Sequence, residues 1–161
     1  WQFMATKKFD YDDFAGFFDL LPETLNGQRL QHVVEVRNAT FNDPKFIGLC
    51  RDRGVTICNS ENENYPLIPD ITGGVVYLRL ISADDEIPTG YVAEDLDLWA
   101  GRFREYAQGR VPGDFTPVDR TGPPEGPRDV YAFVIHEGKV RAPAAAMEFI
   151  RRVDPDFTPA A

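Results

Sequence analysis

Cysteine, histidine and long apolar runs are scarce in this chain of 161 residues, which contains two Cys and two His. Cys50 and Cys58 lack the spacing of a metal-ligand motif, so we expect reduced thiols in the core of a cytoplasmic protein. Because sulfur and imidazole ligands are so few, we expect no zinc site. Magnesium held by Glu35 and Glu61 is the alternative, which the neighbouring Arg disfavours, so we expect no metal and no cofactor. No apolar run approaches the roughly 20 residues that span a bilayer, so no membrane partner is expected.

Basic residues are also in the minority, since 17 Lys and Arg face 26 Asp and Glu and the formal net charge is −9. The resulting field repels phosphate backbones, so we expect no nucleic-acid partner. The sequence contains no glycine-rich phosphate loop, no Gly-x-Ser-x-Gly elbow and no His-Glu-x-x-His motif. With 43% apolar and 27% charged residues, the composition is that of one globular domain.

Helical and strand patterns alternate along the chain. Helices are predicted at 14–21, at 44–53 after the opening Pro44, at 94–108 and at 144–153. Apolar strands are predicted at 33–37, 55–58, 75–80 and 130–135, and residues 1–3 have the pattern of a strand end. This order predicts an α/β fold, a parallel sheet covered by helices. The Gly- and Pro-rich stretch 109–129 is predicted to be a mobile loop or a lid.

Two opposite charges share one face of the strand predicted at 33–37. Residues two apart on a strand point the same way, so Glu35 and Arg37 share a face, while Val34 and Val36 face the other side. Burying a charge is costly unless it has a partner or a task. This strand is therefore the best candidate site in the sequence.

Five motifs follow one another in a recognisable order. They are His32-Val33-Val34-Glu35-Val36-Arg37, Tyr77-Leu78-Arg79-Leu80, Gly90-Tyr91, Leu98-Trp99-Ala100 and Lys139-Val140-Arg141-Ala142-Pro143-Ala144-Ala145-Ala146. Together they resemble the second half of the YecE-like family, also called domain of unknown function 72. The resemblance implies a TIM-type (β/α) barrel. Only its C-terminal five strand–helix units are expected here, as a partial barrel over residues 1–154 with a frayed tail at 155–161.

A partial barrel has two open sheet edges and an apolar interior exposed to water. The resemblance therefore implies a partner for closure, either the missing N-terminal barrel half or a second copy of the chain. Because the sequence starts at Trp1 rather than at an initiator Met, truncation is the expected origin of the missing units.

Active sites of TIM barrels lie at the carboxyl ends of the strands. The resemblance places Glu35, Arg37, Glu61 and Arg79 near that rim. Glu35, Arg37 and Arg79 are the candidate catalytic residues, and paired Arg side chains suit an anion such as phosphate or carboxylate. An adjacent Arg lowers the pKa of a Glu and makes it a poor general base. The alternative is an ion-pair network that only stabilises the barrel interior.

Ligand-binding candidates outside that group are Glu61, Tyr91, His136, Lys139 and Arg141. Tyr91 lies in a loop where it is expected to line a pocket. His136 either transfers protons near neutral pH or lies in a solvated turn. Lys139 and Arg141 either bind an anion near the start of the last helix or cap that helix at the surface.

The function predicted from these residues is the binding of a small anionic or polar metabolite at the strand ends, with hydrolytic or phosphate-related activity left open. The alternatives are a non-enzymatic binding or interaction module and a truncated barrel whose charged strand residues are structural. Where family members commonly have Leu-His-Gly, this chain has Leu80-Ile81-Ser82, which puts a His-dependent mechanism in doubt. The sequence does not decide whether the protein is an enzyme.

Overall fold

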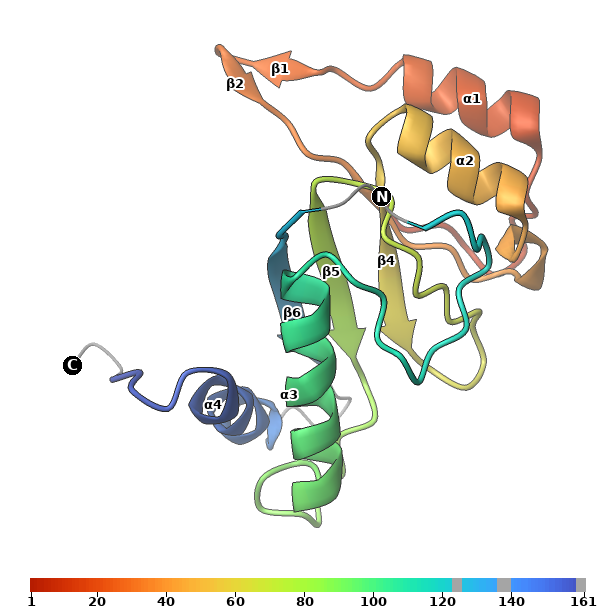
Figure 1. Cartoon of the computed structure of the whole chain (residues 1–161). Helices are drawn as coiled ribbons and strands as arrows, with labels where there is room; N and C mark the ends of the chain where they lie inside the picture. The colour runs from red at the N-terminus through yellow and green to blue at the C-terminus, as the bar shows by residue number, and fades with distance from the viewer. Residues whose placement is uncertain (123–125, 136–139, 159–161) are drawn as a thin grey trace.

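A parallel sheet with helices along one face forms the framework of the chain, as a computed structural model of residues 1–122, 126–135 and 140–158 describes it (Figure 1). The strands follow the order β3-β4-β5-β6. The helices are α1 (Tyr11–Asp19), η1 (Ala39–Phe41), α2 (Pro44–Asp52), α3 (Ala93–Ala107) and α4 (Ala142–Val153), and the strands of the sheet are β3 (Val33–Val34), β4 (Thr56–Glu61), β5 (Val75–Leu80) and β6 (Asp129–Val134). The predicted α/β fold with a parallel sheet is confirmed.

Local capping explains where the first two α-helices begin. The Asp10 side chain accepts a hydrogen bond from Asp13 N at 3.0 Å, and the Asp43 side chain accepts one from Lys45 N at 2.8 Å. Both carboxylates satisfy backbone donors that a helix leaves unpaired in its first turn. Gly54 follows α2 with a φ of +62°, a conformation that glycine adopts without strain, and turns the chain into β4.

The first three residues extend the sheet beside β3. Gln2 forms an isolated parallel bridge with Glu35, and Phe3 N donates to Glu35 O at 2.9 Å. Glu35 N in turn donates to Trp1 O at 2.8 Å. The strand character expected for residues 1–3 is therefore present as a single bridge.

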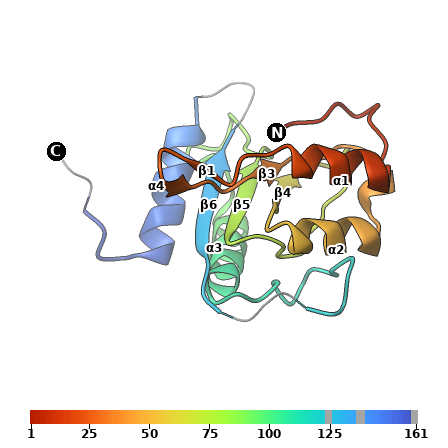
Figure 2. The ribbon, with the colours of Figure 1, turned by 90° about the horizontal axis from the view of Figure 1, so that it is seen from above.

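The helices form an arc around the sheet, with α1 and α2 at one end, α3 in the middle and α4 at the other end (Figure 2). One apolar cluster joins α1 and α2 to the start of the sheet, and a second joins α3 and α4 to β5. Cys50 and Cys58 are free and buried. None of the described helices is long and apolar enough to cross a membrane.

The opposite face of the sheet has no described helix against it. Side chains that alternate with the core residues lie there, and we call this surface the helix-free face: Glu35, Cys58, Tyr77, Arg79, Tyr131 and Phe133. On β6 the contrast with a core strand is clear, because Tyr131 is 49% exposed and Phe133 is 42% exposed. In β5, Leu78 lies between Tyr77 and Arg79 in the sequence, points to the helix-covered face and is fully buried.

One feature of the fold was not predicted. A short antiparallel hairpin joins β1 (Thr24–Leu25) to β2 (Gln28–Arg29). Its turn has positive φ at Asn26 (52°) and Gly27 (78°), the geometry that the Asn-Gly pair favours. Between β4 and β5 the chain crosses without a helix, through a loop over residues 62–74, in agreement with the absence of a predicted helix between the strands expected at 55–58 and 75–80.

Candidate functional site

Glu35 lies on the helix-free face, directly after β3 and at the end of the sheet opposite β6. Its neighbours Val34 and Val36 are 0% and 4% exposed and face the apolar core. The alternation predicted for the strand is confirmed. Glu35 itself is only 6% exposed, so its charge needs hydrogen-bond donors close by.

Both carboxylate oxygens of Glu35 accept hydrogen bonds. Oε1 accepts from Nε and Nη2 of Arg37 at 2.9 and 2.8 Å. Oε2 accepts from Gln2 Nε2 at 2.9 Å and from Arg79 Nη1. The structure therefore brings the three candidate catalytic residues together, and we call Glu35, Arg37, Arg79 and Gln2 the Glu35 cluster.

The surroundings of Glu35 have opposing effects on its pKa. Burial raises the pKa, while the hydrogen bonds from Gln2, Arg37 and Arg79 lower it, and the net result is a pKa below the usual range of a glutamate. The side chain is thus a carboxylate at neutral pH, and its oxygens are already occupied by donors. This arrangement suits a residue that orients two guanidinium groups better than one that accepts a proton.

The two arginines retain donors that the cluster does not use. Arg37 Nη1 and the Nε and Nη2 groups of Arg79 donate to none of the described residues. Arg37 also lies over the Tyr65 ring, with Cζ 4.8 Å from the ring centroid. The side chains of Arg37 and Arg79 are 24% and 20% exposed, so both arginines reach the surface in part.

A hollow of about 290 Å³ opens on the helix-free face at the Glu35 cluster. Its lining consists of Trp1, Gln2, Val33, Glu35, Cys58, Tyr77 and Arg79. Burial and the charge of Glu35 raise the pKa of the Cys58 thiol to about 12, so this thiol is protonated at neutral pH. Burial also raises the pKa of Tyr77. These two groups stay neutral, and the charged side chains that line the hollow are those of Glu35 and Arg79, while Arg37 binds Glu35 from outside the lining.

Glu61 and Tyr91 form a separate polar group on the helix side of the sheet. Glu61 follows Ser60, and this one-residue offset turns its side chain toward α3. Oε1 accepts from Trp99 Nε1 at 2.9 Å, and Oε2 accepts from the Tyr91 hydroxyl at 3.0 Å. Backbone N–H groups of Ile81 and Ser82 donate to the same Oε2.

This position differs from the expectation that Glu61 approaches the same rim as Glu35. Because the two carboxylates occupy opposite faces of the sheet, they do not form one ligand set. Tyr91 is 3% exposed and packs against Phe149 of α4, with ring centroids 5.6 Å apart. The predicted ligand-binding role of Glu61 and Tyr91 stays a prediction at a site separate from the hollow.

The remaining candidates lie near the start of α4. Arg141 is the residue before that helix, and its Nε donates to Asp85 O at 2.9 Å, which ties the loop after β5 to the helix. The Arg141 side chain makes no capping hydrogen bond to α4, and both anion binding and helix capping by Arg141 stay predictions. His136 and Lys139 lie outside the described residues.

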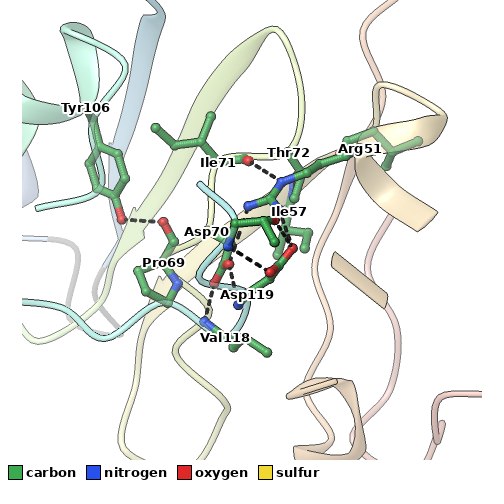
Figure 3. A network of polar contacts seen from close by, with 11 residues as sticks. Arg51, Ile57, Pro69, Asp70, Ile71, Thr72, Tyr106, Val118 and Asp119 are labelled. Carbon is green, nitrogen blue, oxygen red and sulfur yellow. Dashed lines mark hydrogen bonds and ion pairs between the residues drawn. The ribbon is translucent and has the colours of Figure 1, made fainter. Parts of the chain in front are cut away.

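The stretch after α3 packs on the helix side as far as the structure describes it. Asp70 accepts hydrogen bonds from Val118 N at 2.7 Å and Asp119 N at 2.9 Å (Figure 3). Arg51 of α2 pairs with Asp119 and donates to Ile71 O at 3.3 Å. The lid expected in this stretch is therefore wrong for residues 109–122, which cover β4 beside α2 and α3 rather than the Glu35 cluster.

No group of three or more His, Cys, Asp or Glu side chains among residues 1–122, 126–135 and 140–158 is arranged to hold a metal ion.

The sequence interpretation missed three contributors to the hollow and its surroundings. Gln2 donates to Glu35, Tyr65 lies under Arg37, and Phe133 stacks on Tyr77. For Gln2 and Phe133 the clue was available, because a parallel register brings alternate residues of neighbouring strands onto one face. Tyr65 comes from a loop, where no periodic pattern gives a position.

The chain matches the family model described as protein of unknown function DUF72 over residues 1–160. The chain belongs to the DUF72 family. The YecE-like resemblance of the sequence motifs is thereby confirmed, because the two names denote the same family. The family description assigns no activity. No curated protein matches this DUF72 chain.

Two solved DUF72 structures share the fold of this chain. The protein from Thermotoga maritima matches with a TM-score of 0.66 and 16% identity over 95% of this chain and 56% of its own. The protein from Enterococcus faecalis matches with a TM-score of 0.61 and 11% identity over 99% of this chain and 60% of its own. This DUF72 chain thus spans little more than half the length of either protein.

Proposed function

We propose that this DUF72 chain binds a small anionic or polar metabolite in the hollow at the Glu35 cluster. The observation that carries the proposal is the pair of guanidinium groups held around one buried carboxylate, each with N–H donors left over. Guanidinium groups with free N–H donors suit carboxylate and phosphate oxygens, which they bind through charge-assisted hydrogen bonds.

The charge balance of the Glu35 cluster supports an anionic ligand. Two arginines and one glutamate give the cluster a formal charge of +1, while the whole chain carries −9. A positive site in a negative molecule attracts an anion locally and selects against large polyanions, which meet the repulsive field of the rest of the chain. The ligand class is therefore a small molecule rather than a nucleic acid.

We also propose that further strand–helix units close the sheet into a TIM-type barrel around this hollow. The exposed aromatic side chains of β6 and the greater length of the two matched proteins support this closure. The units come from another part of the same protein or from a second copy of the chain. Closure would bury the helix-free face and place the Glu35 cluster near the carboxyl ends of the barrel strands.

Binding is better supported than turnover. Hydrolytic or phosphate-related chemistry needs a group that accepts or donates a proton, and among the described residues of the hollow Glu35 is saturated with donors and Cys58 is held neutral. A catalytic role for the cluster would therefore rely on a residue beyond those described, such as His136.

Calorimetric titration of the full-length protein with inorganic phosphate and with acetate tests the proposal. Arg79→Met should weaken binding of whichever anion binds by about tenfold or more, because it removes a charge-assisted hydrogen bond. The matched control is Arg53→Met, since Arg53 pairs with Asp19 on the helix side and lies outside the hollow. Absence of anion binding to the wild type, or equal weakening by both variants, would favour a cluster that only stabilises the fold.

A further inference from the structure

Aromatic side chains lie beside the Glu35 cluster on the helix-free face. The rings of Tyr77 and Phe133 are stacked, with centroids 4.8 Å apart and planes at 26°. Phe133 keeps 42% of its surface exposed and Tyr131 keeps 49%. Exposed rings grouped in this way mark a contact surface more often than isolated apolar residues do.

The strand register joins these rings to the arginine side of the cluster. Phe133 is the register partner of Arg79, and Tyr131 is the partner of Tyr77. Partners on neighbouring parallel strands share a face and lie about 4.8 Å apart. A molecule whose acidic group contacts Arg79 therefore has the ring surface of Phe133 and Tyr77 next to it.

The cluster end of this surface is polar and the β6 end is aromatic. At the polar end, Arg37 has one side against Tyr65 and offers Nη1 to a ligand. At the other end, the rings of Tyr77 and Phe133 are in direct contact with each other. An ionic group a few ångströms from a flat apolar platform fits a ligand with the same two parts.

On the basis of the proposed function, we infer that the ligand of the hollow is a small aromatic acid, a planar ring that carries a phosphate or carboxylate group. The acidic group accepts hydrogen bonds from Arg79, the arginine that lines the hollow. The ring packs against Phe133 and Tyr77 on the helix-free face. Phe133 is then a specificity-determining residue, because it contacts the ring of the ligand and does not contact its acidic group.

Four probes in calorimetric titrations of the full-length protein test this inference: inorganic phosphate, phenyl phosphate, benzoate and cyclohexanecarboxylate. Phenyl phosphate should bind about three- to tenfold tighter than inorganic phosphate, the gain expected of a ring contact. Benzoate should bind more tightly than cyclohexanecarboxylate by a similar factor, because only benzoate has a planar aromatic ring. The stronger of phenyl phosphate and benzoate identifies the acidic group.

Phe133→Leu should remove most of the advantage of the aromatic probes and leave the affinity for inorganic phosphate unchanged. Phe157→Leu is the matched control, because Phe157 is equally exposed, at 43%, and lies in the segment after α4. Circular dichroism of both variants shows whether the fold is kept. If phosphate binds and the ring adds nothing, or Phe133→Leu changes nothing, the inference is overturned and the proposed function stands. If no anion binds, the proposed function fails and this inference fails with it.

Discussion

Glu35, which is buried, and Glu61, which is half-buried, show two ways in which one fold holds a carboxylate by hydrogen bonds. Glu61 is held by neutral donors, among them the Trp99 indole, the Tyr91 hydroxyl and backbone N–H groups. Glu35 is held mainly by the guanidinium groups of Arg37 and Arg79. Only the second arrangement leaves positive charge and free donors at the surface, which is why we assign the ligand to the Glu35 cluster.

Glu35→Gln should lower the free energy of unfolding at pH 7 by about 1–3 kcal/mol, because two partly buried arginines lose their counter-charge. The pH dependence should change as well. Since the pKa of Glu35 is lower in the folded state, its stabilising effect is complete above the unfolded-state pKa of about 4.3 and is lost as the pH falls through the folded-state value. Urea unfolding at a series of pH values measures both effects.

The wild type should therefore lose stability below about pH 4.3 more steeply than Glu35→Gln. Glu63→Gln is the matched control, because it makes the same chemical change at an exposed glutamate. If the wild type and Glu35→Gln give parallel curves across that range, the carboxylate does not depend on its arginines in the folded state.

At the scale of the element, strand alternation could be predicted from the sequence and loop placement could not. The period of two assigned Val34 and Val36 to the core and Glu35 to the other face, as the structure has them. The same period continued to Glu61 places it on the helix side, but the strand was predicted only over residues 55–58, and the position of Glu61 near the rim came from the resemblance. A slip of one residue exchanges the faces of a strand.

Sequence patterns could not predict the loop contacts between distant residues. Asp70 meets Val118 and Asp119, which lie 48 and 49 residues further along the chain, and no local spacing indicates such a pairing. The contact fixes the stretch after α3 over β4, where a crossover helix is missing from residues 62–74. The Gly- and Pro-rich composition correctly predicted a loop there, but not the face on which it lies.

Asp70→Asn should release this loop. An amide has one acceptor oxygen, and its NH₂ group faces a backbone donor, so at least one of the two buried hydrogen bonds is lost. We expect the free energy of unfolding to fall by about 1–3 kcal/mol and the amides of Val118 and Asp119 to exchange faster with deuterium. Asp52→Asn, at the exposed end of α2, is the control. Unchanged exchange at both amides would contradict the proposed tether.

At the scale of the whole molecule, the feature that needs a physical explanation is the uncovered helix-free face of the sheet. All described helices pack on the other side, and Tyr131 and Phe133 expose aromatic surface on the last strand of the sheet. A parallel sheet is ordinarily covered on both faces, either by helices or by closure into a barrel. The family resemblance gave the barrel expectation, and the structure supplies the parallel sheet that such a barrel requires.

Backbone geometry on β6 offers a direct test of closure. Ile135 N donates to Leu80 O at 2.7 Å, so by alternation Phe133 N–H also faces β5, while the N–H groups of Ala132 and Val134 face the free edge. If a further strand pairs with that edge in the full-length protein, Ala132 and Val134 should exchange with deuterium at least about 100-fold more slowly than unprotected amides. Phe133 is an internal control, because its N–H is bonded to β5 in either case. Rapid exchange at Ala132 and Val134 beside a protected Phe133 would mean that β6 is a true sheet edge and that the barrel does not close there.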